Sequence, residues 1–239
     1  MPHDTASVVL DETFSNAIDL FNSCAGMQRF WGGELNAAHY ASLMREIYFH
    51  TRENPQIQAL ATVYFRGHQR TMVKPFLRHA ISEVGHDQLA LKDMQALGYD
   101  VTAIPAEQPL PATTAITAFP FYQITNLNPV GYLGYLYFLE AMPTTFGAEY
   151  MRTLDAMGVS REAMNFLHDH STIDVGHTRL MQGYIEELIQ NEADLEAACY
   201  AMRVTGELYG RMLTDAFAAA DRQAVGTSGY GINHAEQAA

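Results

Sequence analysis

Two histidines and one aspartate near the C-terminal third of the chain have a spacing that suits metal binding. His170, Asp174 and His177 follow one another at steps of four and three residues in a segment with helical character. Such steps return to one face of an α-helix, so we expect the three side chains to point the same way. Imidazole nitrogens and carboxylate oxygens are ligands of iron, manganese and zinc. The spacing therefore predicts part of a metal centre.

An earlier segment is a near copy of this one. His79, Glu83 and His86 repeat the steps of four and three, and both segments end in an acidic residue followed by Val-Gly-His. Glu83 and His86 also have the E-x-x-H spacing of di-iron sites in helix bundles. One of the three could instead hold a ligand in place without binding metal. As ligands we rank His86 first, His79 second and Glu83 third.

Glu140 is the third element of the predicted centre. It is the only charged residue between Val130 and Phe146, a stretch dense in Tyr, Leu and Phe. Burial of an unpaired carboxylate costs several kcal/mol by rough reckoning, and a metal cation would offset that cost. The alternatives are a surface acid beside Pro143 or a hydrogen-bonded acid in the core. Two metals need a bridging carboxylate, for which Glu140 is our candidate, and we expect Glu140 and His79 to serve in catalysis.

Other polar residues carry weaker signals. Glu46 has the pattern of a surface acid, although its helix could bring it to the core. His39, His50 and His68 are isolated in sequence, which favours surface positions or hydrogen-bonded core positions. His168 lies two residues before His170, on the opposite side of the expected helix, and is predicted to face solvent.

The composition bounds the class of protein. Hydrophobic residues make up 48% of the 239 residues and charged residues 17%, which supports one large folded domain and argues against disorder. The net charge of −13 disfavours nucleic acid as a partner. The two cysteines are far apart in sequence, and neither a secretory signal nor a membrane-spanning stretch is visible. We therefore expect a cytoplasmic protein without a membrane partner, and leave open whether it forms a homodimer.

Helical patterns dominate, and no convincing strand pattern is found. We expect one domain over residues 1–225 with a flexible Gly/Ser-rich tail over 226–239. Residues 100–129 contain several prolines, so we expect a long connection with one short helix near 113–118, and aromatic residues 119–122 beside a pocket. The helices are expected over 12–30, from 36, from 55, over 75–97, from 130, over 161–190 and over 193–220. This predicts an all-α bundle of about seven helices, with metal ligands on facing helices.

Together, the segment Glu83-Val-Gly-His86, the lone Glu140 and the H-x-x-x-D-x-x-H segment at 170–177 resemble the haem-oxygenase-like di-iron oxidases, also called iron-containing redox enzymes. The resemblance extends over about residues 43–185, and its motifs are specific only in combination. It implies a haem-oxygenase-like bundle of seven helices that holds two Fe(II) ions and takes dioxygen as co-substrate. The second substrate would be a small molecule, most simply an amino acid.

The chain departs from the family pattern at His79, where several members have a glutamate ligand. This histidine favours a member type that converts the side chain of a dibrominated tryptophan to a nitrile. Related alternatives are oxidative decarboxylation or fragmentation of a fatty acid or aliphatic amino acid. Outside these, we retain a metal-free enzyme on the same scaffold, similar to thiaminases, and a metal-binding helical protein without turnover. Arg66, Lys74 and Arg78 are the candidates for holding a substrate carboxylate.

Overall fold

The computed structural model describes residues 3–172 and 174–224, with side chains described in these ranges except at 3–5 and 174–179. The described residues form an all-α fold without a strand, as the sequence predicts. The domain end expected at 225 and the tail over 226–239 lie outside the described residues and stay predictions. No helix of the described part combines the length and the apolar character needed to cross a membrane.

The described helices outnumber the seven expected because several expected helices are divided. The α-helices are α1 (His3–Ser23), α2 (Ala25–Trp31), α3 (Ala37–Thr51), α4 (Asn54–Tyr64), α5 (Val73–Ser82), α6 (Asp87–Ala96), α7 (Pro111–Asn126), α8 (Tyr132–Ala156), α9 (Asn165–Thr172), α10 (Asp174–Leu188) and α11 (Glu192–Ala224). Short 3-10 helices occur at Gly67–Met72, Ile104–Ala106, Pro129–Gly131 and Arg161–Ala163.

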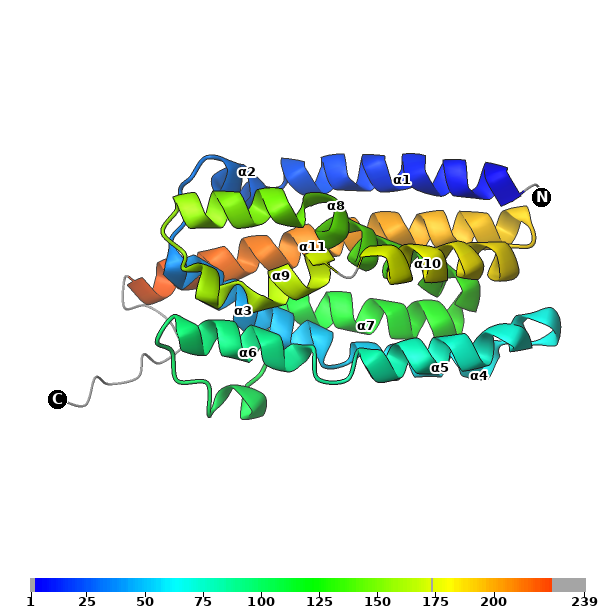
Figure 1. Ribbon diagram of the computed structural model, residues 1–239, viewed down its shortest axis with the longest axis horizontal. Coiled ribbons are helices and arrows are strands. Elements are labelled where there is room, and N and C mark those ends of the chain that lie inside the picture. Colours follow the sequence, from blue (N-terminus) through cyan, green and yellow to red (C-terminus); the bar gives the residue numbers. More distant parts are fainter. Residues whose placement is uncertain (1–2, 173, 225–239) are drawn as a thin grey trace.

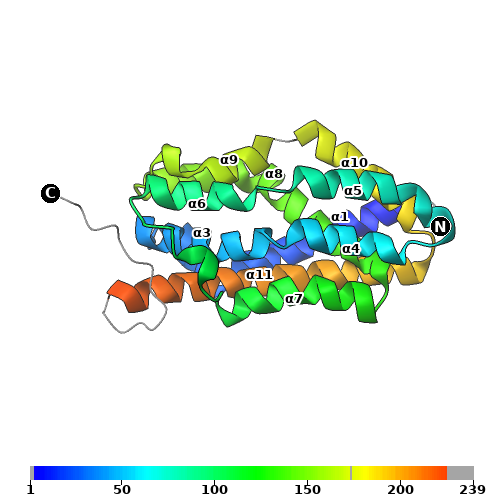
Figure 2. The same ribbon diagram turned by 90° about the horizontal axis from the view of Figure 1, so that it is seen from below.

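The helices pack with their long axes roughly aligned, as Figure 1 shows. The two long helices α1 and α11 lie side by side along the bundle. Figure 2 shows α5 and α6 in line along one side, α3 and α4 in line next to them, and α7 beside α11 on the opposite side. The helix α9 packs against α6 and α8. The turn between α5 and α6 thus lies close to α9, which is distant in sequence.

Several helix ends were predictable because their capping residues are visible in the sequence. The Asn36 side chain accepts hydrogen bonds from the backbone N–H groups of Ala38 and His39 and begins α3. Pro55 lies in the first turn of α4, where its missing N–H costs nothing. Gly98 follows α6 with a φ of 86°, the left-handed conformation that ends helices. These three expectations are confirmed.

The continuous helix expected over 75–97 is wrong. Helix α5 ends at Ser82, residues 83–86 form a turn, and α6 begins at Asp87. Gly85 adopts a φ of 97°, which an L-residue with a side chain rarely tolerates. The first predicted helix is likewise divided, into α1 and α2 at Cys24, whose sulfur accepts a hydrogen bond from the backbone N–H of Met27.

Two further expectations on helix length are corrected. The segment expected as a long connection contains α7, a helix of 16 residues that starts at Pro111 and includes Pro120. Proline at the first position favours a helix start, and burial of Thr113, Ile116 and Ile124 supplies the packing that stabilises the rest. Of the helix expected over 161–190, residues 161–163 form a 3-10 helix instead, α9 begins only at Asn165 and α10 ends at Leu188, with residue 173 between them outside the described residues.

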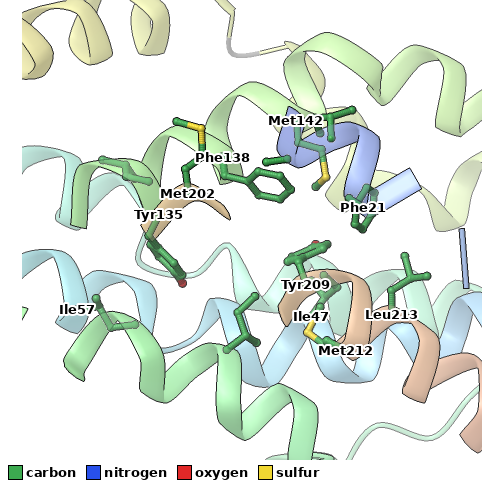
Figure 3. Packing of buried hydrophobic residues seen from close by; sticks show 14 of the residues in the cluster. Phe21, Ile47, Ile57, Tyr135, Phe138, Met142, Met202, Tyr209, Met212 and Leu213 are labelled. Atoms are coloured by element: carbon green, nitrogen blue, oxygen red, sulfur yellow. The ribbon is translucent and has the colours of Figure 1, made fainter. Parts of the chain in front are cut away.

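The core joins the middle of α8 to α1, α3 and α11. Figure 3 shows Phe21, Phe138, Met142 and Tyr209 pointing into the same space between these helices. Burial of each such large apolar side chain contributes about 1.5–3 kcal/mol. Close contact of α8 with α11 requires Gly134, because a Cβ there would lie 1.8 Å from the Ala198 carbonyl oxygen. This packing fixes the helix that carries Glu140.

Candidate metal centre

Glu83 lies in the turn between α5 and α6, and its carboxylate faces two histidines. One oxygen, Oε1, is 3.5 Å from Nε2 of His79, and the other, Oε2, is 3.2 Å from Nδ1 of His86. His79 comes from α5 and His86 from the end of the turn. Because the helix ends before Glu83, the two imidazoles approach different oxygens of the same carboxylate.

Two groups of potential ligands share this glutamate. The first joins Glu83 to His86 and His170, and the second joins it to His79 and Glu140; within each group one nitrogen or carboxylate oxygen per residue lies within 4.8 Å of the others. Glu140 meets the second group through Oε1, 3.2 Å from Nε2 of His79. Glu140, expected from the sequence to bridge two metals, belongs to one group only, whereas Glu83 belongs to both.

The charges in this cluster stabilise one another. Burial disfavours the charged form of His79, but hydrogen bonds with Glu140 and Glu83 outweigh burial and raise its pKa to about 9. Burial likewise opposes ionisation of Glu83, but hydrogen bonds with His79 and His86 lower the pKa of its carboxyl. The hydrogen bond with Glu83 is also the main reason that the pKa of His86 is raised. The Glu83 carboxylate is therefore ionised and able to bind a cation.

His170 reaches the cluster from α9. Its ring centroid lies 5.0 Å from that of His86. Its Nδ1 lies 2.7 Å from the carbonyl oxygen of Phe166, so Nδ1–H donates and Nε2 carries the lone pair. Burial lowers the pKa of His170, which favours the neutral imidazole that binds metals. A backbone carbonyl in this role is the usual way in which a metal-binding histidine is oriented.

Five of the seven predicted ligands therefore meet at one place: His79, Glu83, His86, Glu140 and His170. Asp174 and His177 belong to the first turn of α10, but their side chains lie outside the described residues. Their role as ligands stays a prediction. His168 is exposed on α9, on the side expected from its spacing to His170.

A cavity of about 130 Å³ opens beside the ligand cluster. Glu83, Glu140 and His170 form part of its wall. Helix α8 contributes wall residues from Glu140 to Leu154, positions about 21 Å apart at 1.5 Å per residue. The rest of the wall is mostly apolar and comes from α1, α2, α3, α9 and α11: Phe21, Met27, Phe30, Leu43, Met44, Ile47, Phe166, Leu167, Tyr209, Leu213 and Phe217.

Apart from Glu83, Glu140 and His170, the polar side chains of the cavity wall are neutral hydrogen-bonding groups. His50 and Asn54 line the cavity, and the hydroxyl of Tyr135 lies 2.8 Å from both His50 Nε2 and Asn54 Oδ1. Burial lowers the pKa of His50 to about 4, so its imidazole is neutral near pH 7. His50 was expected to be a surface or core residue, and its place beside the cavity had no signal in the sequence.

The substrate-binding residues suggested by the sequence lie elsewhere. Arg66, Lys74 and Arg78 are not among the described residues that line the cavity, and neither are the aromatic residues at 119–122. The aromatic wall residues are scattered over α1, α2, α3, α8, α9 and α11, so no local pattern announced them. The fold alone brings them together.

The reading of Glu46 as a surface acid is wrong. Its side chain is 1% exposed and forms an ion pair with Arg45. It also accepts hydrogen bonds from the Leu110 backbone N–H and the Thr113 hydroxyl. Glu46 thus ties α3 to the start of α7 and is not part of the metal cluster.

Comparison with known proteins agrees with this architecture. The family model of iron-containing redox enzymes matches residues 41–210. A domain of unknown function with a haem-oxygenase-like fold from Shewanella denitrificans has a TM-score of 0.84 at 23% identity, covering 93% of this chain and 96% of its own. A TenA homologue from Pseudomonas syringae pv. tomato has a TM-score of 0.68 at 12% identity, covering 87% and 91%.

A TenA family transcription regulator from a Silicibacter species gives a TM-score of 0.63 at 14% identity, covering 88% of this chain and 95% of its own. At such identities these likenesses establish the fold and not the activity. Comparison with curated protein sequences gives no match.

Proposed function

The chain belongs to the iron-containing redox enzyme family, and we propose that within this family it is a non-haem di-iron oxidase that uses dioxygen to oxidise an amino acid with an apolar side chain. The observation that carries the proposal is the position of Glu83. Its two carboxylate oxygens face histidines of two different ligand groups. A shared carboxylate is the usual link between the metals of a two-metal centre.

The donor set fits iron. Each ligand group combines imidazole nitrogen with carboxylate oxygen and lacks a thiolate, a set that suits Fe(II). One iron would be held by His79, Glu83 and Glu140, and the other by Glu83, His86 and His170. We propose that Asp174 and His177, which follow His170 in the motif, complete the two sets.

When bound, the irons would supply the electrons and the coordination sites for reaction with dioxygen. The protein residues orient the ligands and exclude water. The Phe166 carbonyl holds His170 with Nε2 toward the cluster. The apolar wall along α8 keeps the cavity poor in water, which limits loss of oxidising equivalents to solvent.

The cavity supports a substrate whose apolar part is slender. An engineered cavity of about 150 Å³ lined by Leu, Ile and Phe binds benzene, so a space of about 130 Å³ suits one aromatic ring or a narrow aliphatic chain. The described wall offers no Lys or Arg for a carboxylate. A substrate carboxylate would therefore be held by the metal, and an ammonium group would be attracted by Glu83 and Glu140.

The most specific form of the proposal is conversion of a tryptophan side chain to a nitrile. The many aromatic wall residues support an aromatic substrate, since rings pack well against rings. A dibrominated indole is larger than benzene and would require the wall to move. Tryptophan and its brominated forms therefore belong in the substrate panel, beside smaller amino acids.

The proposal is tested by turnover of the iron-loaded protein. Protein loaded with Fe(II) without oxygen is mixed with oxygenated buffer that contains one amino acid, and products are identified by mass spectrometry. We expect an oxidised product in the wild type and in Glu149→Gln, an exposed acid on α8, and none in Glu140→Gln. Oxygen consumption without product for every amino acid tested would reject the amino-acid substrate. Absence of iron binding would reject the di-iron oxidase itself.

A second candidate substrate is a fatty acid, and the shape of the cavity is what favours it. The wall residues on α8 are spread over about 21 Å and the wall is mostly apolar, which fits an alkyl chain with its carboxylate near Glu83 and Glu140. Its reaction would be oxidative decarboxylation. Release of a one-carbon-shorter alkene from a medium-chain acid, with no product from amino acids, would favour this candidate. Binding of iron without turnover of either class would indicate a metal-binding protein.

A further inference from the structure

A buried aspartate outside the ligand set joins two of the helices that build the metal centre. Asp93 lies on α6 with a side-chain exposure of 0%. Its Oδ1 accepts hydrogen bonds from the backbone N–H and the side-chain Nδ2 of Asn165, at 2.8 and 2.9 Å. Its Oδ2 accepts one from the backbone N–H of Phe166, at 3.0 Å. Asp93 thus caps the first turn of α9 from a different helix.

The capped residue is also the residue that orients His170. The Phe166 carbonyl oxygen accepts the hydrogen bond from Nδ1 of His170 at 2.7 Å. The Phe166 ring stacks on the His170 ring, with centroids 4.1 Å apart and planes 28° apart. Phe166 therefore determines both the tautomer of this imidazole and the direction of its plane.

Asp93 itself belongs to the helix that directly follows the ligand His86. Helix α6 begins at Asp87, directly after His86, and Asp93 lies within it. The Asp93 charge acts on Tyr40 of α3 as well, because after burial it is the main reason that the pKa of Tyr40 is raised. Asp93 therefore connects the helix after His86, the helix of His170 and a wall of the cavity.

We propose that Asp93 is a positioning residue, which fixes His170 relative to His86 by holding Phe166. The inference rests on the proposed function only in taking His170 as a ligand. The arrangement of Asp93, Phe166 and His170 exists without metal and is measurable without it. A negative charge at the start of α9 also stabilises that helix, so a purely structural role has to be separated from positioning.

The first test uses the metal-free protein and the histidine tautomer. In protein labelled with ¹⁵N-histidine, NMR reports which ring nitrogen carries the proton, and His170→Gln assigns the signal. We expect the Nδ1–H tautomer in the wild type and a mixture of tautomers in Asp93→Asn, because an amide has one acceptor oxygen for donors on both sides. Asp194→Asn is the matched control: Asp194 is a buried aspartate at the start of α11 that accepts hydrogen bonds from Asn128 and Asn191.

The second test is a titration with Co(II), whose absorption reports ligand number. We expect Asp93→Asn to weaken one of two binding steps by about 10–100-fold, the usual effect of losing a group that orients a ligand. Asp194→Asn should leave both steps unchanged. Asp93→Asn combined with His170→Ala should bind no more weakly than His170→Ala alone, since both changes act on the same ligand.

The outcomes separate this inference from the proposed function. An unchanged His170 tautomer in Asp93→Asn, with Co(II) binding equal to that of Asp194→Asn, would overturn the inference. If the wild type binds no metal, the proposed function fails. The role of Asp93 is then decided by the His170 tautomer alone, compared between the wild type and Asp93→Asn. If Asp93→Asn does not fold, Asp93→Glu keeps both acceptor oxygens but displaces them by one methylene from the N–H groups of Asn165 and Phe166. A disturbed His170 signal in that variant supports the chain of contacts, and an unchanged one rejects it.

Discussion

The two copies of the acid-Val-Gly-His segment occupy different local structures. In the first copy, Glu83–His86 forms the turn between α5 and α6, with Gly85 in the left-handed conformation. In the second copy, Asp174–His177 forms the first turn of α10. The same residue types thus form a turn after α5 in the first copy and belong to helix α10 in the second. His170 of the second motif belongs to α9, and residue 173, between α9 and α10, lies outside the described residues.

This difference shows how the centre is assembled. On one straight helix, His79, Glu83 and His86 would point in one direction, and only one metal could use them all. Because the chain turns at Glu83, the histidine before it and the histidine after it face different oxygens of one carboxylate. The first ligand motif thus lies at a junction between two helices. The single-face arrangement inferred from spacing is therefore replaced, in the first motif, by ligands gathered around a turn.

The largest effect is expected from loss of the shared carboxylate. Glu83→Ala removes a ligand from both groups, so we expect neither iron to be retained and affinity to fall by more than the roughly 100-fold typical of an orienting residue. Iron content after anaerobic loading and desalting measures this. Retention of one iron by Glu83→Ala would mean that the two groups are independent.

Replacement of a single histidine should have a smaller effect, because each histidine belongs to one ligand group only. His79→Ala affects only the group with Glu140, and His170→Ala only the group with His86, so each variant should keep one iron. His168→Ala, an exposed histidine on the same helix as His170, is the control and should keep both. Equal loss of both irons in His79→Ala and His170→Ala would contradict the assignment of each histidine to its own group.

A change in the turn should destabilise the first junction. Gly85→Ala forces a side chain into a φ of 97°, at a cost of about 1–2 kcal/mol in the free energy of unfolding. Gly183→Ala in α10 has open space around the added Cβ and should stabilise the protein, by up to about 1 kcal/mol. Urea unfolding of both variants tests the contrast. If Gly85→Ala were as stable as the wild type, the turn would not require its left-handed residue.

The smallest effect on iron binding is expected for a buried residue outside both ligand groups. Tyr135→Phe removes a hydroxyl that lies between His50 and Asn54, which should cost about 1–3 kcal/mol of stability because buried polar groups lose a partner. Iron content should be unchanged, since Tyr135 belongs to neither ligand group. Thermal unfolding and iron analysis of the same sample measure the two effects. Loss of iron in this variant would extend the centre beyond the residues assigned to it.

The sequence carried local information well and long-range information poorly. Asn36, Pro55 and Gly98 act on backbone groups beside them, so the helix ends they make were predictable. The break at Glu83 was not, because nothing near Gly85 distinguishes a glycine inside a helix from one that ends it. Burial of Glu46 depends on Arg45 and on residues more than 60 positions away, which a local pattern does not show.

At the candidate site, too, local features were predictable from the sequence and long-range contacts were not. Spacing identified residue types able to bind iron, and the structure brings five of the seven to one place. Spacing did not identify Glu83 as the shared residue, since that depends on the direction of each carboxylate oxygen. Asp93 also had no signal in the sequence, because its partners Asn165 and Phe166 are 72 and 73 residues away.

The claim that two metals share Glu83 is tested most directly by diffraction. Crystals of the protein grown without oxygen and loaded with Fe(II) would be measured at the iron absorption edge, where anomalous scattering locates iron alone. We expect two peaks: one among His79, Glu83 and Glu140, and one among Glu83, His86 and His170. A single peak, or two peaks of which one lies away from Glu83, would contradict it.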